Sequence, residues 1–225
     1  MRIVSPAAGV WRVGRTPDPI EFPDPPRADE LDYPRAGNRF DSPTENFRVC
    51  YFATDLNACF GETLSRFRSD PALIAAADEE GFMPAGSVPA DWRNQRIAVQ
   101  VKFVPNELLP ELRFLDIEAL KTRRELRSEL ASLLAYYGYE DLDVPTVRGA
   151  DRRITRWIAK WAFEQRDADG APVFAGIRYL SRLNTEWECW AVFHDVEIKE
   201  ITREPIERES EALKTIARHF DLTVF

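Results

Sequence analysis

Arg39, Tyr51 and Glu62 are the residues whose types and order best suit chemistry on a bound ligand. Arg39 lies in a turn-forming segment, residues 37–43, Tyr51 lies in the apolar run that follows, and Glu62 lies in the next segment. A guanidinium can hold a phosphate through two N–H bonds, an aromatic ring can stack on a planar base, and a carboxylate can act on a sugar. Together the three side chains suit a nucleotide.

Two short elements must position Tyr51 and Glu62. Residues 47–53 form a dense apolar run of strand length, and Asp55 can cap a helix after it. Residues 56–67 place apolar side chains at offsets of three and four, which predicts a helix with one face on a core. Glu62 lies away from the centre of that apolar stripe. Because the turn between strand and helix is short, the side chains of Tyr51 and Glu62 can both lie at the same end of a sheet.

The other segments predict an α+β fold. Runs rich in β-branched and aromatic residues predict strands at 9–13, 96–104, 112–117, 172–179, 188–193 and 195–201. Helix-forming or helix-periodic segments are 118–137, 148–165 and 205–219. Strands thus gather at both ends of the chain, with helices between them. This order predicts a mixed, mainly antiparallel sheet flanked by helices.

The chain length favours one domain with insertions. The 225 residues are enough for one substantial core, so we expect a single domain over residues 1–225. Residues 16–36 contain many prolines among acidic residues and are expected to run over the surface as a loop. Residues 69–95, rich in Ala, Gly and Pro, are expected to be a surface insertion. No internal repeat is visible, which argues against solenoids and propellers.

The composition points to a cytoplasmic protein that does not bind nucleic acid directly. The net charge is −8, whereas phosphate backbones are bound by an excess of Lys and Arg. Three widely spaced cysteines predict neither a disulfide framework nor a zinc ribbon and indicate a reducing compartment. The N-terminus lacks a secretory pattern, and no stretch approaches the roughly 20 apolar residues of a membrane span.

Metal and thiol chemistry are not expected. His194 and His219 are too few and too far apart for a convincing zinc site, and no Walker A or dinucleotide glycine motif is present. Cys59 falls on the apolar stripe of the predicted helix, which favours a buried thiol over a nucleophile.

Three segments of the chain resemble the blocks of a known family, the RES domain, which is named for its Arg, Glu and Ser. They are GNRFDSP around Arg39, CYFATDLNACFGETL from Cys50, and GIRYLSRLN around Ser181. The second block has the family's spacing between Tyr51 and Glu62. The aromatic-Arg-Val at residues 11–13 also resembles the family's first strand and makes Arg12 a further candidate. Relative to compact members, residues 69–95 and 115–168 look like insertions.

The resemblance implies an ADP-ribosyltransferase-like fold and cleavage of the nicotinamide–ribose bond of NAD. The reaction would be hydrolysis or phosphorolysis, with transfer of ADP-ribose to a protein as the alternative. The resemblance also implies a toxin of a toxin–antitoxin pair, with an Xre-type antitoxin as partner, and a homodimer. A hypothesis from another functional class is a non-catalytic module that binds a nucleotide or a partner protein. Such a module would need nearly the same residues. No metal is expected.

By the same resemblance, Glu62 binds the ribose hydroxyls and the positive charge that develops on the sugar. Arg39, alone or with Arg12, would hold the pyrophosphate. Tyr51 would stack on the nicotinamide or its ribose, and Ser181 would hydrogen-bond that end of the ligand. These four residues, Arg39, Tyr51, Glu62 and Ser181, are the predicted catalytic set.

Each of these residues also has a simpler interpretation. Glu62 could be a solvated surface residue, and Tyr51 a core tyrosine with a satisfied hydroxyl. Arg39 could be a surface arginine, and Arg12 could pair with a neighbouring acid. Ser181 could end a strand through a local backbone bond.

Overall fold

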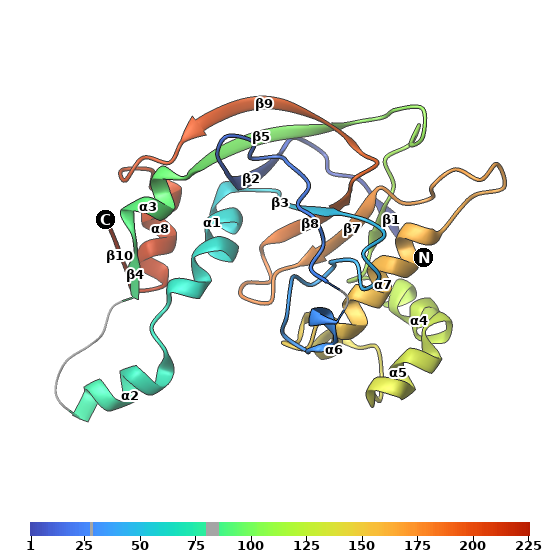
Figure 1. Ribbon diagram of the computed structural model, residues 1–225, viewed down its shortest axis with the longest axis horizontal. Coiled ribbons are helices and arrows are strands. Elements are labelled where there is room, and N and C mark those ends of the chain that lie inside the picture. Colours follow the sequence, from blue (N-terminus) through green and yellow to red (C-terminus); the bar gives the residue numbers. More distant parts are fainter. Residues whose placement is uncertain (28, 80–85) are drawn as a thin grey trace.

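The computed structural model describes residues 1–27, 29–79 and 86–225, and its main feature is a long, curled sheet (Figure 1). Within these residues the sheet has eight strands in the order β1-β6-β7-β8-β3-β2-β5-β9, with only β6 and β7 parallel. Its strands are β1 (Ile3–Val4), β2 (Val10–Arg15), β3 (Val49–Ala53), β5 (Arg96–Val104), β6 (Phe114–Asp116), β7 (Gly176–Leu180), β8 (Glu188–Phe193) and β9 (Glu197–Pro205). The predicted α+β class with a mainly antiparallel sheet is confirmed.

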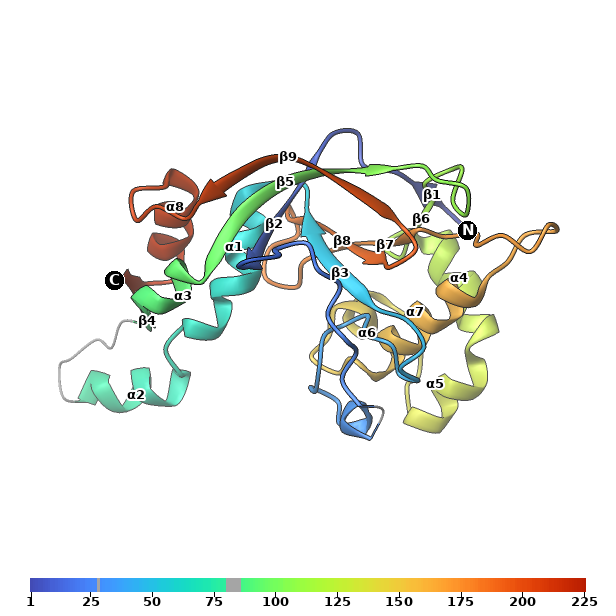
Figure 2. The ribbon, with the colours of Figure 1, turned by 45° about the horizontal axis from the view of Figure 1, so that its top comes forward.

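Helices gather at two ends of this sheet. The helices are α1 (Leu56–Leu64), α2 (Pro71–Glu79), α3 (Ala90–Asn94), α4 (Leu120–Glu129), α5 (Ala131–Tyr137), α6 (Val144–Arg148), α7 (Arg153–Glu164) and α8 (Glu211–His219). Figure 2 shows β5 and β9 arching over the molecule, with α1, α3 and α8 near one end and α4 to α7 near the other. A small parallel pair, β4 (Gly86–Val88) and β10 (Leu222–Val224), lies at the α8 end. The two helical groups therefore lie apart, near different ends of the sheet.

The unit from β3 to α1 forms largely as local sequence signals predict. The side chain of Asp55 accepts a hydrogen bond from the backbone N–H of Ala58 at 2.9 Å, which caps α1. The apolar stripe of the helix is buried, whereas Glu62 is exposed. The last turn of the predicted helix, Ser65–Phe67, is a 3-10 turn. Strand β3 and helix α1 thus place Tyr51 and Glu62 in the same part of the molecule.

Several predicted boundaries are wrong, each for a local reason. The predicted helix 118–137 is divided at Leu130, whose φ of −107° and ψ of 19° leave the helical region. An unpredicted helix, α6, precedes α7 because Asp143 caps it through the N–H of Thr146. The strand predicted at 195–201 continues to Pro205, so α8 begins at Glu211.

The predicted loop and insertion are only partly described. In the described part of residues 16–36 the regular structure is one 3-10 turn, Glu30–Asp32, in keeping with the predicted loop. The insertion predicted at 69–95 contains α2, β4 and α3, which were not predicted. Residues 80–85 of that insertion lie outside the described residues.

Candidate functional site

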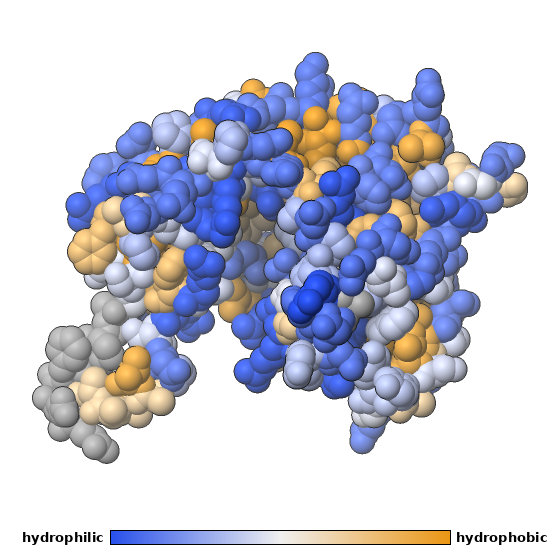
Figure 3. Space-filling model, viewed as in Figure 1, coloured by the Kyte–Doolittle hydropathy of each residue, from blue (hydrophilic) through white to orange (hydrophobic). Residues whose placement is uncertain are grey.

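A cavity of about 540 Å³ is lined by residues of β2, β3 and α1, by the loop that carries Arg39, and by Arg152 just before α7. Figure 3 shows the surface hollowed near its centre, between the part that carries α1 and the part that carries α6. The cavity is within the size range of ligand pockets. Its lining includes three acidic residues, Asp18, Glu21 and Glu62, and six arginines, Arg12, Arg15, Arg39, Arg96, Arg152 and Arg182. The lining is therefore basic in a chain whose net charge is −8.

Glu62 lies in this lining, and Ser181 holds its carboxylate. The hydroxyl of Ser181 donates a hydrogen bond to Oε1 of Glu62. Ser181 is fully buried, and its Oγ also accepts from the N–H of Leu183 at 3.0 Å. The backbone N–H of Ser181 donates to the carbonyl of Trp187 at 2.9 Å. Ser181 is not among the residues that line the cavity, and its hydroxyl contacts the carboxylate of Glu62, which is.

Tyr51 combines its two interpretations. Its hydroxyl donates to Oδ1 of Asp41 at 2.9 Å and accepts from the N–H of Phe40 at 3.0 Å, as in a satisfied core tyrosine. The half-buried residue also lines the cavity, where its ring can meet a ligand. Burial, followed by the charge of Asp41, raises the pKa of Tyr51 well above its usual value. Its hydroxyl therefore stays protonated and ties the cavity wall to the loop that carries Arg39.

Arg39 lines the cavity and is bound to the end of α6. Its Nη1 donates to the carbonyl of Val147 at 2.8 Å, and its Nη2 donates to those of Arg148 and Gly149 at 3.1 and 3.0 Å. A cation is favourable at a helix C-terminus, where the last carbonyls lack partners in the helix. An arginine has five N–H donors, so these bonds leave donors for a ligand. Burial is the main cause that lowers the pKa of the guanidinium, which still remains charged.

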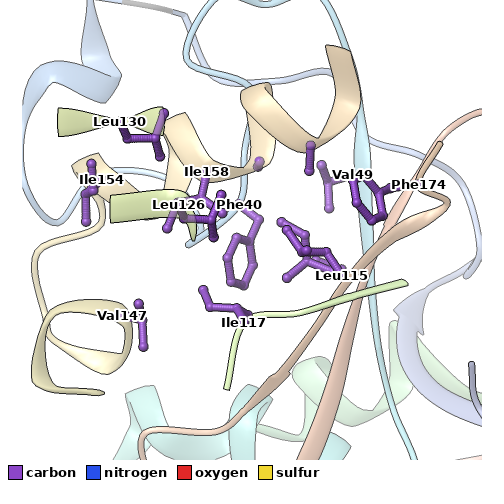
Figure 4. Packing of buried hydrophobic residues seen from close by; sticks show 14 of the residues in the cluster. Phe40, Val49, Leu115, Ile117, Leu126, Leu130, Val147, Ile154, Ile158 and Phe174 are labelled. Atoms are coloured by element: carbon purple, nitrogen blue, oxygen red, sulfur yellow. The ribbon is translucent and has the colours of Figure 1, made fainter. Parts of the chain in front are cut away.

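The loop around Arg39 is anchored by α7 and by the core. Thr155 donates to the carbonyl of Arg39 at 2.7 Å, and the buried guanidinium of Arg156 donates to the carbonyls of Tyr33, Ala36 and Asn38. Phe40 is fully buried, and Figure 4 shows its ring between side chains of the helices and those of Leu115 in β6 and Ile117 just after it. The orientation of Arg39 is therefore set by contacts far along the chain.

Arg12 also lines the cavity, and backbone carbonyls hold it. Its Nε donates to the carbonyl of Pro19 at 2.7 Å and its Nη1 donates to that of Tyr51 at 2.9 Å. The guanidinium carbon lies 5.8 Å from the centre of the Phe52 ring. The ion pair that we considered for Arg12 is not found among the described residues. Arg12 instead fastens the proline-rich loop to β3.

The structure adds residues to the candidate site that the sequence did not reveal. Arg15, Arg96, Arg152, Arg182 and Tyr179 all line the cavity. Arg182 directly follows Ser181 in the third sequence block, a position that could have suggested it. The others come from separate strands and loops, so their proximity depends on the tertiary fold.

An ion pair connects the Ser181 strand to the Arg39 loop. Glu118 accepts from Nε and Nη2 of Arg148, the shortest contact being 2.6 Å, and its Oε1 accepts from the N–H of Leu180 at 3.0 Å. Leu180 precedes Ser181, and the carbonyl of Arg148 accepts from Arg39. The side chain of Glu118 is only 9% exposed, which makes this bidentate pair stronger than a surface pair.

The cysteine thiols lie in the interior of the protein. Cys50, Cys59 and Cys189 are all buried, which confirms the interpretation of Cys59 as a buried thiol. Burial raises the pKa of Cys50 to about 11 and that of Cys59 to about 12, so both thiols stay protonated. In the part of the chain that the structure describes, no three His, Cys, Asp or Glu side chains are grouped as metal ligands would be. Likewise, no described helix has the length and apolar character needed to cross a membrane.

Comparison with known proteins assigns the chain to a class. The model of the RES domain matches residues 10–215, and the chain belongs to the RES domain family. All three sequence blocks lie within the match. No curated protein sequence matches the chain.

Among solved structures, the chain is similar to one titled the crystal structure of the M. tuberculosis MbcT-MbcA toxin-antitoxin complex. The TM-score is 0.43 at 12% identity, with 89% of this chain and 87% of that chain covered. This likeness is distant and carries no argument about the site.

Proposed function

We propose that this protein binds NAD in the cavity and cleaves the bond between nicotinamide and ribose. Membership of the RES domain family supports the proposal. The observation that carries it is the Glu62 carboxylate, which Ser181 holds at the wall of an arginine-lined cavity. The arrangement combines an acid able to act on a sugar with cations able to hold its phosphates.

The chemistry follows from the charge that bond cleavage creates. As the C–N bond breaks, its electron pair leaves with nicotinamide, and positive charge develops on the ribose, as in glycoside hydrolysis. A carboxylate fixed in advance stabilises that charge without reorganising. Ser181 provides the fixation, because its buried hydroxyl donates to Glu62. An oxygen of water, of phosphate or of a protein side chain then forms the new bond to the sugar.

The other lining residues are assigned to binding. Arg39, with Arg152 and Arg182 near enough to influence its pKa, forms a cationic group beside Glu62. We assign this group, together with Arg12, to the anionic part of the ligand. The ring of Tyr51 lines the same cavity and is assigned to the nicotinamide or its ribose.

Release of nicotinamide from NAD tests the proposal. Glu62→Gln keeps the shape of the side chain and removes its charge, and we expect it to slow release by about 100-fold or more. Glu129→Gln is the matched control, because Glu129 is an exposed glutamate at the end of α4. Equal rates for the wild type and Glu62→Gln would remove Glu62 from the mechanism. Tight binding of NAD without turnover by the wild type would instead indicate a binding module.

The same assay identifies the acceptor. Hydrolysis yields ADP-ribose, and phosphorolysis requires added phosphate and yields a phosphorylated product. Transfer to a protein leaves labelled polypeptide when labelled NAD is mixed with a lysate. Each outcome places a different nucleophile at the sugar carbon while keeping the same role for Glu62.

We also propose that the chain acts as a cytoplasmic toxin with a protein antitoxin as partner, as its family suggests. Expression of the wild type should arrest growth, and Glu62→Gln should relieve the arrest. Harmless expression of active wild type would contradict the toxin role. An Xre-type antitoxin and a homodimer remain predictions, which pull-down with the neighbouring gene product and light scattering would test.

A further inference from the structure

Arg15 and Arg96 form a second basic group in the cavity lining. They are opposite each other across the antiparallel pair of β2 and β5, and both line the cavity. Arg96 is held in place, because its Nη1 donates to the carbonyl of Trp92 at 3.0 Å and its guanidinium lies 4.9 Å from the centre of that ring. Arg66, from the 3-10 turn after α1, is the next charge in the group.

Among the described residues no acidic side chain is paired with these arginines, although Asp18 and Glu21 line the same cavity. Acidic residues outnumber basic ones in the chain, 38 to 30, yet within the described residues Arg15, Arg66 and Arg96 form no ion pair. Burial, followed by the charges of Arg15 and Arg66, lowers the pKa of Arg96. Like charges gathered at a cavity wall favour a bound anion, which would relieve their repulsion.

Arg15 and Arg96 lie on the paired strands β2 and β5, whereas Arg39, Arg152 and Arg182 lie in loops. The charged side chains that act on the pKa of Arg39 include Arg152, Glu62 and Arg182. Those that act on Arg96 are Arg15 and Arg66. The cavity lining therefore has one pair of arginines on adjacent strands and a second set in loops, and the second set includes the group beside Glu62.

We propose that Arg15 and Arg96 form a phosphate subsite that binds a phosphate group of the dinucleotide. Guanidinium groups bind phosphate oxygens through charge-assisted hydrogen bonds, often in pairs. The identity of the ligand rests on the proposed function, whereas the anionic character of the subsite rests on the arginines alone. The phosphate has two possible sources, the pyrophosphate that every such dinucleotide carries or the 2′-phosphate of NADP.

Binding of two uncleavable ligands tests the subsite. ADP-ribose carries the pyrophosphate, and 2′-phospho-ADP-ribose carries an additional phosphate. We expect Arg15→Gln and Arg96→Gln each to weaken binding by about tenfold or more, measured by calorimetry, because each removes charged hydrogen bonds. Arg124→Gln, an exposed arginine of α4, makes the same change in net charge and should change binding less than about twofold. Arg96→Lys is the control for misfolding of the glutamine variant, because it retains the positive charge. Its affinity for the ligands should lie between those of the wild type and Arg96→Gln.

The two ligands distinguish the source of the phosphate. An equal loss for both ligands indicates that Arg15 and Arg96 share the pyrophosphate with the arginines beside Glu62, and a larger loss for 2′-phospho-ADP-ribose places the 2′-phosphate at Arg15 and Arg96. Variants that bind both ligands as Arg124→Gln does, or a wild type that binds neither, overturn the subsite. If binding depends on Arg15 and Arg96 but the wild type releases no nicotinamide, the subsite stands and the proposed reaction fails. If nicotinamide is released and both variants bind normally, only the subsite fails.

Discussion

On one wall of the cavity Glu62 projects from a regular helix, whereas on the other Arg39 lies in a loop outside the helices and strands. The helix of Glu62 is capped by Asp55, a few residues away. The loop of Arg39 is held by hydrogen bonds to Val147, Arg148 and Gly149, which lie 108, 109 and 110 positions along the chain. Local signals thus place the acid, and long-range polar contacts place the arginine.

This difference predicts which kind of substitution destabilises each wall. A helix packed on a core should be sensitive to changes of volume, because interiors are close-packed. A loop held by hydrogen bonds to buried groups should be sensitive to removal of one polar atom, which leaves its partners unsatisfied. Substitutions on the two walls are therefore expected to act through different interactions.

The largest effect is expected at Gly61, beside Glu62. A Cβ at this position would lie 2.1 Å from two ring atoms of Trp187, which is 7% exposed. Gly61→Ala should lower the free energy of unfolding by about 3 kcal/mol, measured in urea. It should also slow nicotinamide release, because the backbone of Trp187 accepts from Ser181. Adding Trp187→Phe makes room and should restore part of the stability. Full stability of Gly61→Ala would show that this wall is not tightly packed.

On the loop wall, Tyr51→Phe removes one oxygen and leaves the ring. The N–H of Phe40 and the carboxylate of Asp41 then lose a partner inside the protein. We expect the free energy of unfolding to fall by about 2 kcal/mol, by chemical denaturation. Tyr136→Phe is the control, because Tyr136 is 77% exposed. If Tyr51→Phe is as stable as this control, the hydroxyl does not hold the loop.

Ser181→Ala tests the contact that fixes Glu62. The variant loses the hydrogen bond to the carboxylate and leaves the N–H of Leu183 without its acceptor. Nicotinamide release should slow by about tenfold, equivalent to about 1.4 kcal/mol, mainly through kcat. Ser128→Ala, at an exposed position of α4, should have no effect. A change confined to KM would indicate that Ser181 acts on ligand binding instead of positioning the acid.

The smallest effect is a loss of stability in alkaline solution. Burial raises the pKa of Cys50 to about 11 and of Cys59 to about 12, and it raises that of Cys189 as well. The folded state then retains protons that the unfolded chain releases near its usual thiol pKa. The stabilisation is complete below the unfolded pKa and is lost as pH rises toward the folded values. Between about pH 8 and about pH 9 the free energy of unfolding should fall by about 1 kcal/mol. Cys50→Ala should flatten this dependence, and an unchanged stability would contradict buried, protonated thiols.

Local sequence patterns were enough to predict the unit that carries Tyr51 and Glu62. The apolar run before Asp55, the cap and the spaced apolar residues of α1 are neighbours in the chain, so their pattern predicts strand, turn and helix. The same pattern assigned Cys59 to the buried stripe and Glu62 to the opposite side, as the structure confirms. The motifs of the RES domain could be recognised in the sequence because each block is a continuous stretch of residues.

The contacts of those residues, by contrast, depend on the fold of the whole chain. Ser181 and Glu62 are 119 positions apart, and Arg39 meets α6, a helix that the sequence did not reveal. The arginine lining was equally hidden, because Arg15 and Arg96 become neighbours through strand pairing between β2 and β5. Hydrogen bonds and charge clusters between distant residues depend on how the whole sheet closes, and the spacing of residues along the chain does not encode that closure.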